Sequence, residues 1–168
     1  MFPKNRPIIN VPSTETNRFL NWFIVLLLMV YIAYVFTQFN ALPDTIPTHF
    51  GKDGVADSYG AKKSIWLLPG IALLMSIGLS IASKYPHLFN YPVKVTHENA
   101  FRLYSFGIKL IQFTSIYVIL LFFYISYVTI KIANNPSSEG LHAGFLPIII
   151  VSSLLFTVFV LFKINTLK

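Results

Sequence analysis

The chain contains no cysteine and little charge. Of its 168 residues only 11 % are charged, whereas a soluble domain carries about 25 %. The lack of Cys excludes a disulfide scaffold, and 8 glycines are too few for a collagen-like repeat. A hydrophobic content of 55 % also excludes a disordered chain. The class that remains is an integral membrane protein.

Charge is missing altogether from four long stretches. Residues 19–43, 64–83, 110–130 and 140–162 contain no Lys, Arg, Asp or Glu and are 25, 20, 21 and 23 residues long. A helix needs about 20 apolar residues to cross the hydrocarbon, and strands of a membrane barrel would be shorter and alternating. The sequence therefore predicts an all-α integral membrane protein, a bundle of four transmembrane helices in a single domain over residues 18–168. The expected helices cover about residues 19–40, 64–83, 97–133 and 143–163.

The first 17 residues are polar and contain three prolines, which predicts a flexible N-terminal segment. The first apolar run is longer than the apolar region of a signal peptide, and no small-x-small cleavage site follows it. We expect a retained helix.

Basic residues are distributed unevenly between the predicted connections. Four spans place both termini and the loop at residues 84–96 on one side, and that side carries 9 of the 13 Lys and Arg residues. The positive-inside rule then predicts that both termini are cytoplasmic. Because the basic residues follow the membrane flanks, the expected partner is the lipid bilayer, and no nucleic-acid partner is expected.

The four charge-free stretches contain no Lys, Arg, Asp or Glu, and no His lies near the middle of one. Coupled transporters and intramembrane metallo- or aspartyl proteases need carboxylates or histidines at membrane depth. The sequence therefore argues against both classes, and no cofactor is expected.

Small residues recur along the second predicted helix. Ala72, Ser76 and Ser80 are spaced by four residues, a pattern that lets helices approach closely in lipid. Two interpretations remain open, packing inside the bundle, which we favour, and a homodimer through this helix.

The connection between the first two helices, residues 41–63, is rich in Pro, Gly and Asp. It predicts successive turns in a structured loop outside the cytoplasm, packed over the mouth of the bundle. His49, Asp53 and Asp57 are weak candidates for metal ligands, since their spacing matches neither an EF-hand nor a zinc site. A turn-forming role is favoured for the aspartates. His49 has three interpretations: a bond to local carbonyls, a response to external acidity, or a ligand contact.

The same loop resembles a known family. The segments Leu42-Pro43 and Ile46-Pro47-Thr48-His49-Phe50, followed by Gly54, Asp57, Gly60, Lys62, Trp66 and Pro69, are similar to the signature of the bacterial membrane family called domain of unknown function 1648. That domain also forms the N-terminal part of SdpI-type toxin-immunity and signalling proteins, which add a further helical region. The resemblance covers about residues 20–130 and implies a protein of the bacterial cytoplasmic membrane.

The function expected from these features is non-enzymatic. We expect a membrane binding or sensing module, concerned with immunity to or signalling of a membrane-active peptide, with a peptide or protein ligand at the loop. The alternatives are a small metal-dependent hydrolase that acts through the His49 loop and a structural subunit of a membrane complex. The expected recognition residues are Pro43, Pro47, Thr48, His49, Phe50, Gly54, Asp57, Gly60, Lys62 and Trp66.

Overall fold

The computed structural model describes residues 6–137, 140–141 and 144–167. The elements in chain order are α1 (Glu15–Phe39), β1 (Thr45–Phe50), β2 (Ala56–Ala61), the 3-10 helix η1 (Lys62–Trp66), α2 (Leu67–Ala82), the 3-10 helix η2 (Pro86–Leu88), α3 (Ala100–Asn134) and α4 (Phe145–Thr166). Within the described residues, α1, η1 with α2, α3 and α4 are each long and apolar enough to cross a membrane. The prediction of four transmembrane helices is confirmed.

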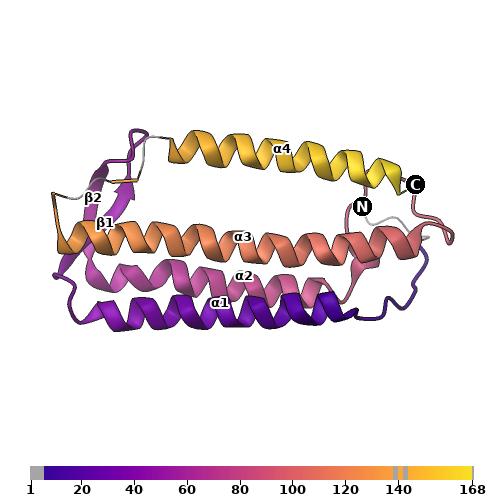
Figure 1. Ribbon diagram of the computed structural model, residues 1–168, viewed down its shortest axis with the longest axis horizontal. Helices are drawn as coiled ribbons and strands as arrows, with labels where there is room; N and C mark the ends of the chain where they lie inside the picture. Colours follow the sequence, from indigo (N-terminus) through magenta and orange to yellow (C-terminus); the bar gives the residue numbers. More distant parts are fainter. Residues whose placement is uncertain (1–5, 138–139, 142–143, 168) are drawn as a thin grey trace.

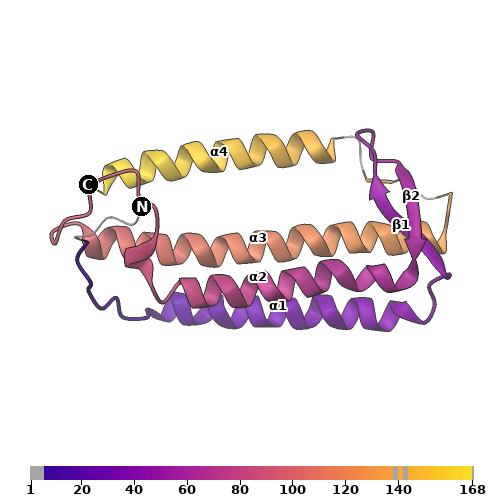
Figure 2. The same cartoon turned by 180° about the vertical axis from the view of Figure 1, so that it is seen from behind.

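Three of the four helices form the packed body of the protein. Its core joins Tyr31 and Val35 of α1, Ala72 of α2, and Ile119 and Ile130 of α3. In the most apolar stretch of α3, 33 % of the residues are buried, whereas none is buried in that of α4. Figures 1 and 2 show α4 running alongside α3 but set apart from it over most of its length. The bundle is thus a three-helix body with an outlying fourth helix.

A buried tyrosine joins α1 to α3. Tyr31 has no exposed surface, and its hydroxyl donates to the carbonyl oxygen of Phe122 over 3.1 Å. The hydroxyl also lies 2.6 Å from Oγ of Ser126, and the ring stacks on Phe123 at 5.2 Å between centroids. The hydroxyl groups of Tyr31 and Ser126 are thus hydrogen-bonded inside an apolar interface. This requirement fixes how α1 and α3 pack against each other.

We expect Tyr31→Phe to lower the free energy of unfolding by about 1–3 kcal/mol, because Ser126 Oγ would lose its partner in a buried site. Thermal unfolding of the detergent-solubilised protein measures this change. Tyr127→Phe is the matched control, since Tyr127 is 47 % exposed on α3. Equal shifts in the two variants would contradict the role given to Tyr31.

The helix boundaries differ from the predicted ones by a few residues. Helix α1 begins at Glu15, four residues early, because the Thr14 side chain accepts a hydrogen bond from the Asn17 backbone N–H and caps the helix. Helix α2 begins late because its expected first turn is the 3-10 helix η1. Helix α4 ends at Thr166 rather than at residue 163, and its expected start at Ala143 lies outside the described residues.

The N-terminal segment is tied to the body over residues 6–14. Arg6 donates a hydrogen bond to the carbonyl oxygen of Phe89 and lies over the ring of Tyr91, 5.4 Å from its centroid. Burial raises the pKa of Tyr91, so its hydroxyl stays protonated. These contacts differ from the loose segment expected over residues 1–17, whose residues 1–5 lie outside the described part of the chain.

The small-residue stripe of α2 is used partly inside the body. Ala72 and Ser76 are 0 % and 7 % exposed, which agrees with internal packing. Ser80 is exposed, so the last member of the pattern does not contribute to that packing.

Residues 45–61 form an antiparallel β-hairpin, β1 with β2. The prediction of successive turns is therefore wrong for this segment, although the predicted structured connection exists. Thr45, Ile46 and Tyr59 favour extended backbone, and Gly54 supplies the left-handed residue of the turn with φ +78°. The hairpin lies at one end of the helices and both termini at the other (Figure 1). We call these the hairpin end and the terminal end.

Candidate functional site

The base of the hairpin is anchored to the body through Lys62. Its backbone N–H donates to the carbonyl oxygen of Asp44 over 2.9 Å, and its ammonium lies 3.1 Å from the Asp44 carboxylate. The same ammonium reaches the carbonyl oxygen of Leu42 at 3.4 Å, near the end of α1. Ile46, 1 % exposed, inserts into the core beside this base. The hairpin is therefore rooted in the three-helix body.

Irregular pairing brings His49 next to Asp57. The register pairs His49 with Ser58 and Phe50 with Ala56, so Asp57 is skipped on β2 and Thr48 on β1. Bulges of this kind re-aim side chains. His49 Nδ1 lies 2.5 Å from a carboxylate oxygen of Asp57, and both side chains are more than half exposed. The pair is a water-facing, charge-assisted contact.

Asp53 serves the turn of the hairpin. Its carboxylate accepts a hydrogen bond from the Val55 backbone N–H over 3.2 Å, as expected for an aspartate that shapes its own turn. Within the described residues, no three His, Cys, Asp or Glu side chains gather as metal ligands. The predicted candidates His49, Asp53 and Asp57 provide one His–carboxylate pair and one turn residue.

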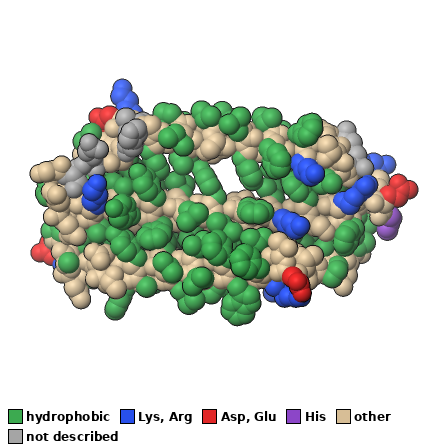
Figure 3. All heavy atoms as spheres, viewed as in Figure 1, with side chains coloured by type: hydrophobic (Ala, Val, Ile, Leu, Met, Phe, Trp, Pro, Cys, Tyr) green, Lys and Arg blue, Asp and Glu red, His purple; other side chains and the backbone are tan. Residues whose placement is uncertain are grey.

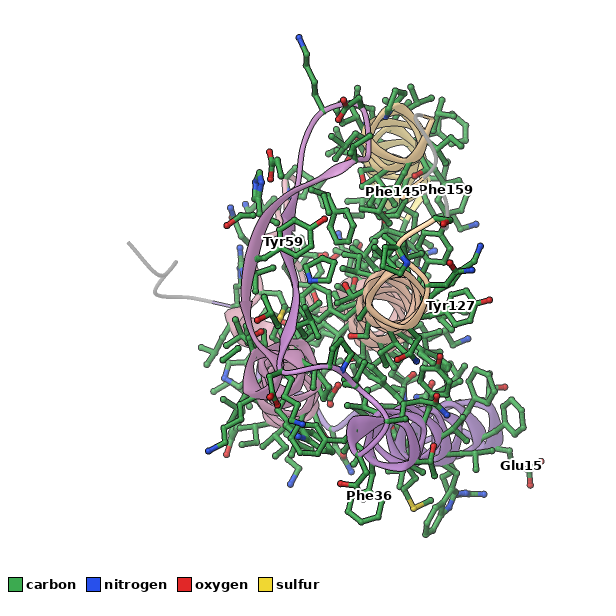
Figure 4. The ribbon with its side chains drawn as sticks, turned by 90° about the vertical axis from the view of Figure 1, so that its left-hand side faces the viewer. Glu15, Phe36, Tyr59, Tyr127, Phe145 and Phe159 are labelled. Carbon is green, nitrogen blue, oxygen red and sulfur yellow. The ribbon has the colours of Figure 1, made fainter. Side chains whose placement is uncertain are left out.

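A cavity of about 320 Å³ lies between the hairpin, the start of α2 and α3. Four consecutive residues of the recognition motif line it, Pro47, Thr48, His49 and Phe50, opposite Thr129 of α3. Phe50 packs against Val128, Ile132 and Leu141, so its ring belongs to the wall of the cavity. Tyr59, 58 % exposed, is the aromatic residue of the hairpin that remains at its surface (Figure 4).

The tip of the hairpin touches the connection between α3 and α4. The Leu141 backbone N–H donates to the carbonyl oxygen of Gly54 over 2.9 Å. A Cβ at Gly54 would lie 1.7 Å from the Leu141 carbonyl oxygen, and a Cβ at Gly140 would lie 2.1 Å from the Gly54 carbonyl oxygen. Two glycines therefore permit this close backbone approach, which we call the clasp (Gly54, Gly140 and Leu141). Figure 4 shows the hairpin extending from α1 and α2 across α3 to the start of α4.

Helix α4 meets the body near both of its ends and is separated from it between them. At the hairpin end, Phe145 stacks on Tyr124 of α3 with centroids 5.4 Å apart. At the terminal end, Ile164 is 5 % exposed and packs with Leu103 and Tyr104. Both contacts join α4 to α3, so α4 is attached to the body near its two ends.

Two cavities of about 380 and 410 Å³ lie between these end contacts, and Tyr117 of α3 lines both. Figure 3 shows openings between α4 and the rest of the molecule. We call this space the slot. Its walls are mostly apolar, and Ser152, Ser153 and Thr157 face it from α4. Ser152 and Thr157 already donate hydrogen bonds to carbonyl oxygens of their own helix, so neither needs a polar partner.

The structure brings together most, but not all, of the residues predicted as a recognition site. Pro47, Thr48, His49 and Phe50 line the cavity under the hairpin, and Asp57 contacts His49. The others are placed as follows: Gly54 forms the clasp, Gly60 pairs with Ile46 in the hairpin, Lys62 anchors its base, and Trp66 packs on Phe39. Pro43 is exposed before the hairpin and does not line the cavity.

Sequence reasoning missed the contributions of α3, of the connection that follows it and of α4. Thr129 and Leu141 complete the cavity, and Tyr117 and Ser153 line the slot. Nothing in the local pattern marks these residues, because Thr129, Tyr117 and Ser153 look like ordinary members of apolar helices and Leu141 like an ordinary loop residue.

Comparisons with known proteins agree with the resemblance of the hairpin segment. Residues 23–73 match the family described as Domain of unknown function (DUF1648). A stretch of 92 residues is 29 % identical to an uncharacterized protein of Archaeoglobus fulgidus and covers 48 % of this chain and 49 % of that protein. The chain thus spans about half the length of this relative. No solved structure matches. From within α1 through the hairpin to the first turns of α2, this multi-pass membrane protein is similar to the domain of unknown function DUF1648.

Proposed function

We propose that this chain is a non-enzymatic binding or sensing module of the bacterial cytoplasmic membrane, with both termini in the cytoplasm. Its ligand is a membrane-active peptide whose apolar segment enters the slot between α3 and α4 from the bilayer. In this proposal, binding protects the cell from the peptide or reports its presence. The orientation follows from the excess of Lys and Arg at the terminal end.

The observation that carries the proposal is that α4 contacts α3 near its two ends and leaves a slot between them. The α4 residues that line the slot run from Phe145 to Thr157, which is about 20 Å of helix. Ser152 and Ser153 give this wall small side chains, which allow another helix to approach closely in lipid. Because two of the three α4 hydroxyls are bonded to their own backbone, the preferred occupant is apolar.

The hairpin supports the proposal as a polar recognition surface at the end of the slot. His49 and Asp57 expose a charge-assisted pair there, and Tyr59 offers an exposed aromatic side chain. Through the clasp, movement of the hairpin is coupled to the connection that precedes α4. A peptide that binds both surfaces would therefore change how α4 is held, and α2, which is joined to the hairpin through η1, would carry the change across the membrane.

The experiment compares growth of cells with and without this chain under a panel of synthetic apolar, helical, membrane-permeabilising peptides. We expect the chain to raise the inhibitory concentration of at least one peptide roughly fivefold, because peptide bound in the slot is removed from the free pool. Ser153→Phe fills the slot and should remove the protection. Val158→Phe is the control, because Val158 is 64 % exposed and does not line the slot.

Photo-crosslinking adds a direct measure of binding. A photoreactive phenylalanine at position 156, in the slot, should capture the protective peptide, whereas the same group at position 36, an exposed site on α1 (Figure 4), should not. Absence of protection by every peptide, or equal protection by Ser153→Phe, would overturn the proposal.

A further inference from the structure

The slot between α3 and α4 is bounded by basic residues from both helices at the terminal end only. The charge-free stretches of the two helices end there at Lys109 and Lys163. Figure 3 shows Lys and Arg side chains gathered over the terminal ends of α3 and α4, near the openings of the slot. At the hairpin end Lys131 of α3 has no counterpart, because Lys163 is the one basic residue within α4.

Lys109 and Lys163 continue the rows of residues that line the slot. Lys109 comes four residues before Phe113 of α3, and Lys163 comes seven residues after Phe156 of α4. Residues four or seven positions apart lie on the same face of a helix. Both lysines are therefore on the faces of α3 and α4 that form the walls of the slot.

The two lysines also lie at similar levels along the bundle. Helices α3 and α4 run antiparallel (Figure 1), and near the terminal end Ile164 of α4 packs with Leu103 and Tyr104 of α3. Counted from this contact, Lys109 and Lys163 differ in level by about 7 Å along the helices. Because lysine carries its ammonium group on a flexible four-carbon stem, both ammonium groups can reach one anionic group placed between the two helices.

Neither lysine is neutralised by the described part of the protein. Among the described residues, Lys109 and Lys163 form no salt bridge, and α3 and α4 contain no Asp or Glu. The charge-free residues 110–130 of α3 span about 31 Å as a helix, which is the thickness of the hydrocarbon. The two ammonium groups thus lie at the level of the lipid head groups, where the available anions are lipid phosphates.

The slot is open to the acyl chains of the bilayer. Phe113 and Tyr117 line it and are 52 % and 42 % exposed, so a chain can enter from the side. An unfilled space between two helices would deprive its walls of dispersion contacts. An acyl chain therefore fills the slot whenever no other apolar ligand does.

We propose that the slot holds an acyl chain of an anionic phospholipid from the leaflet at the terminal end, with the phosphate of that lipid between Lys109 and Lys163. Charge complementarity selects this lipid: the net negative charge of its head group balances the two ammonium groups, whereas phosphatidylcholine has no net charge. A peptide of the kind proposed above has to displace this lipid from the slot. The lipid site itself does not depend on peptide binding.

Native mass spectrometry of the full chain in detergent, without peptide, compares phosphatidylglycerol with phosphatidylcholine of identical acyl chains. One lysine near an anionic lipid contributes roughly a fivefold gain in affinity. We expect phosphatidylglycerol to bind at least about tenfold more tightly, and we expect Lys109→Gln and Lys163→Gln each to reduce this preference about fivefold. Lys84→Gln is the matched control, because Lys84 is an exposed lysine that follows α2 and does not line the slot.

A second pair of variants tests whether the lipid enters the slot. Ser153→Phe fills the slot and should weaken the binding of both lipids, whereas Val158→Phe, at a 64 % exposed position outside the slot, should not. Equal binding of the two lipids, an equal loss of preference in Lys84→Gln and Lys163→Gln, or unchanged binding in Ser153→Phe would each overturn the proposal. Because no peptide is present, these outcomes are independent of the growth test of the proposed function.

Discussion

Gly54→Ala should open the clasp and separate the hairpin tip from the connection to α4. An Ala at φ +78° costs about 1–2 kcal/mol in backbone strain alone. Its Cβ would also lie 1.7 Å from the Leu141 carbonyl oxygen, so the two segments must move apart and lose their hydrogen bond. Among single-methyl substitutions of the glycines, this one combines the largest strain with the closest backbone clash.

The change is measured with two spin labels, on Lys52→Cys in the hairpin turn and Ser137→Cys after α3. Both positions are exposed, and the natural chain has no cysteine to interfere. We expect a longer and broader distance distribution in Gly54→Ala, together with a lower unfolding temperature. Gly78→Ala is the matched control, because its added methyl group meets open space within a helix and should stabilise the protein by up to about 1 kcal/mol. An unchanged distance in Gly54→Ala would show that the clasp does not hold the hairpin.

The membrane-spanning helices could be predicted from the sequence because the hydrocarbon imposes a simple rule. A long run without charge must satisfy its backbone internally, so length and charge are enough to locate α1, α2, α3 and α4. Because the number of spans is even, both termini lie on one side, and the connection after the first span lies on the other. The helix boundaries differ from the predicted ones where local hydrogen bonds decide them, as at the Thr14 cap of α1.

The hairpin was harder to predict because its signals conflict. Pro43, Pro47 and three glycines at 51, 54 and 60 indicate turns, and they outweighed the weaker preference of Thr45, Ile46 and Tyr59 for extended backbone. The deciding contacts are long-range: Ile46 inserts into the core, and Gly54 bonds to Leu141. Neither contact can be recognised from the sequence of the segment alone.

The slot was beyond sequence reasoning for a related reason. In lipid there is no hydrophobic drive to press one apolar helix against another, so the composition of α4 does not reveal whether it joins the body. Gln112 was visible as a polar residue in a span, but its hydrogen bonds to Asn17 and Asn21 depend on how another helix packs against it. Only the packed arrangement shows which polar groups are satisfied.

The arrangement of the chain across the membrane, on which the whole account depends, can be tested directly by labelling introduced thiols from each side. Lys52→Cys places a thiol in the hairpin turn, and Asn165→Cys places one near the end of α4; both sites are exposed. A membrane-impermeant maleimide is applied to spheroplasts before and after permeabilisation. We predict that the thiol at position 52 reacts at once and that the thiol at position 165 reacts only after permeabilisation. Labelling of both positions from the same side would contradict an arrangement in which the four helices separate the hairpin from the chain ends, and the reverse order would contradict the proposed orientation.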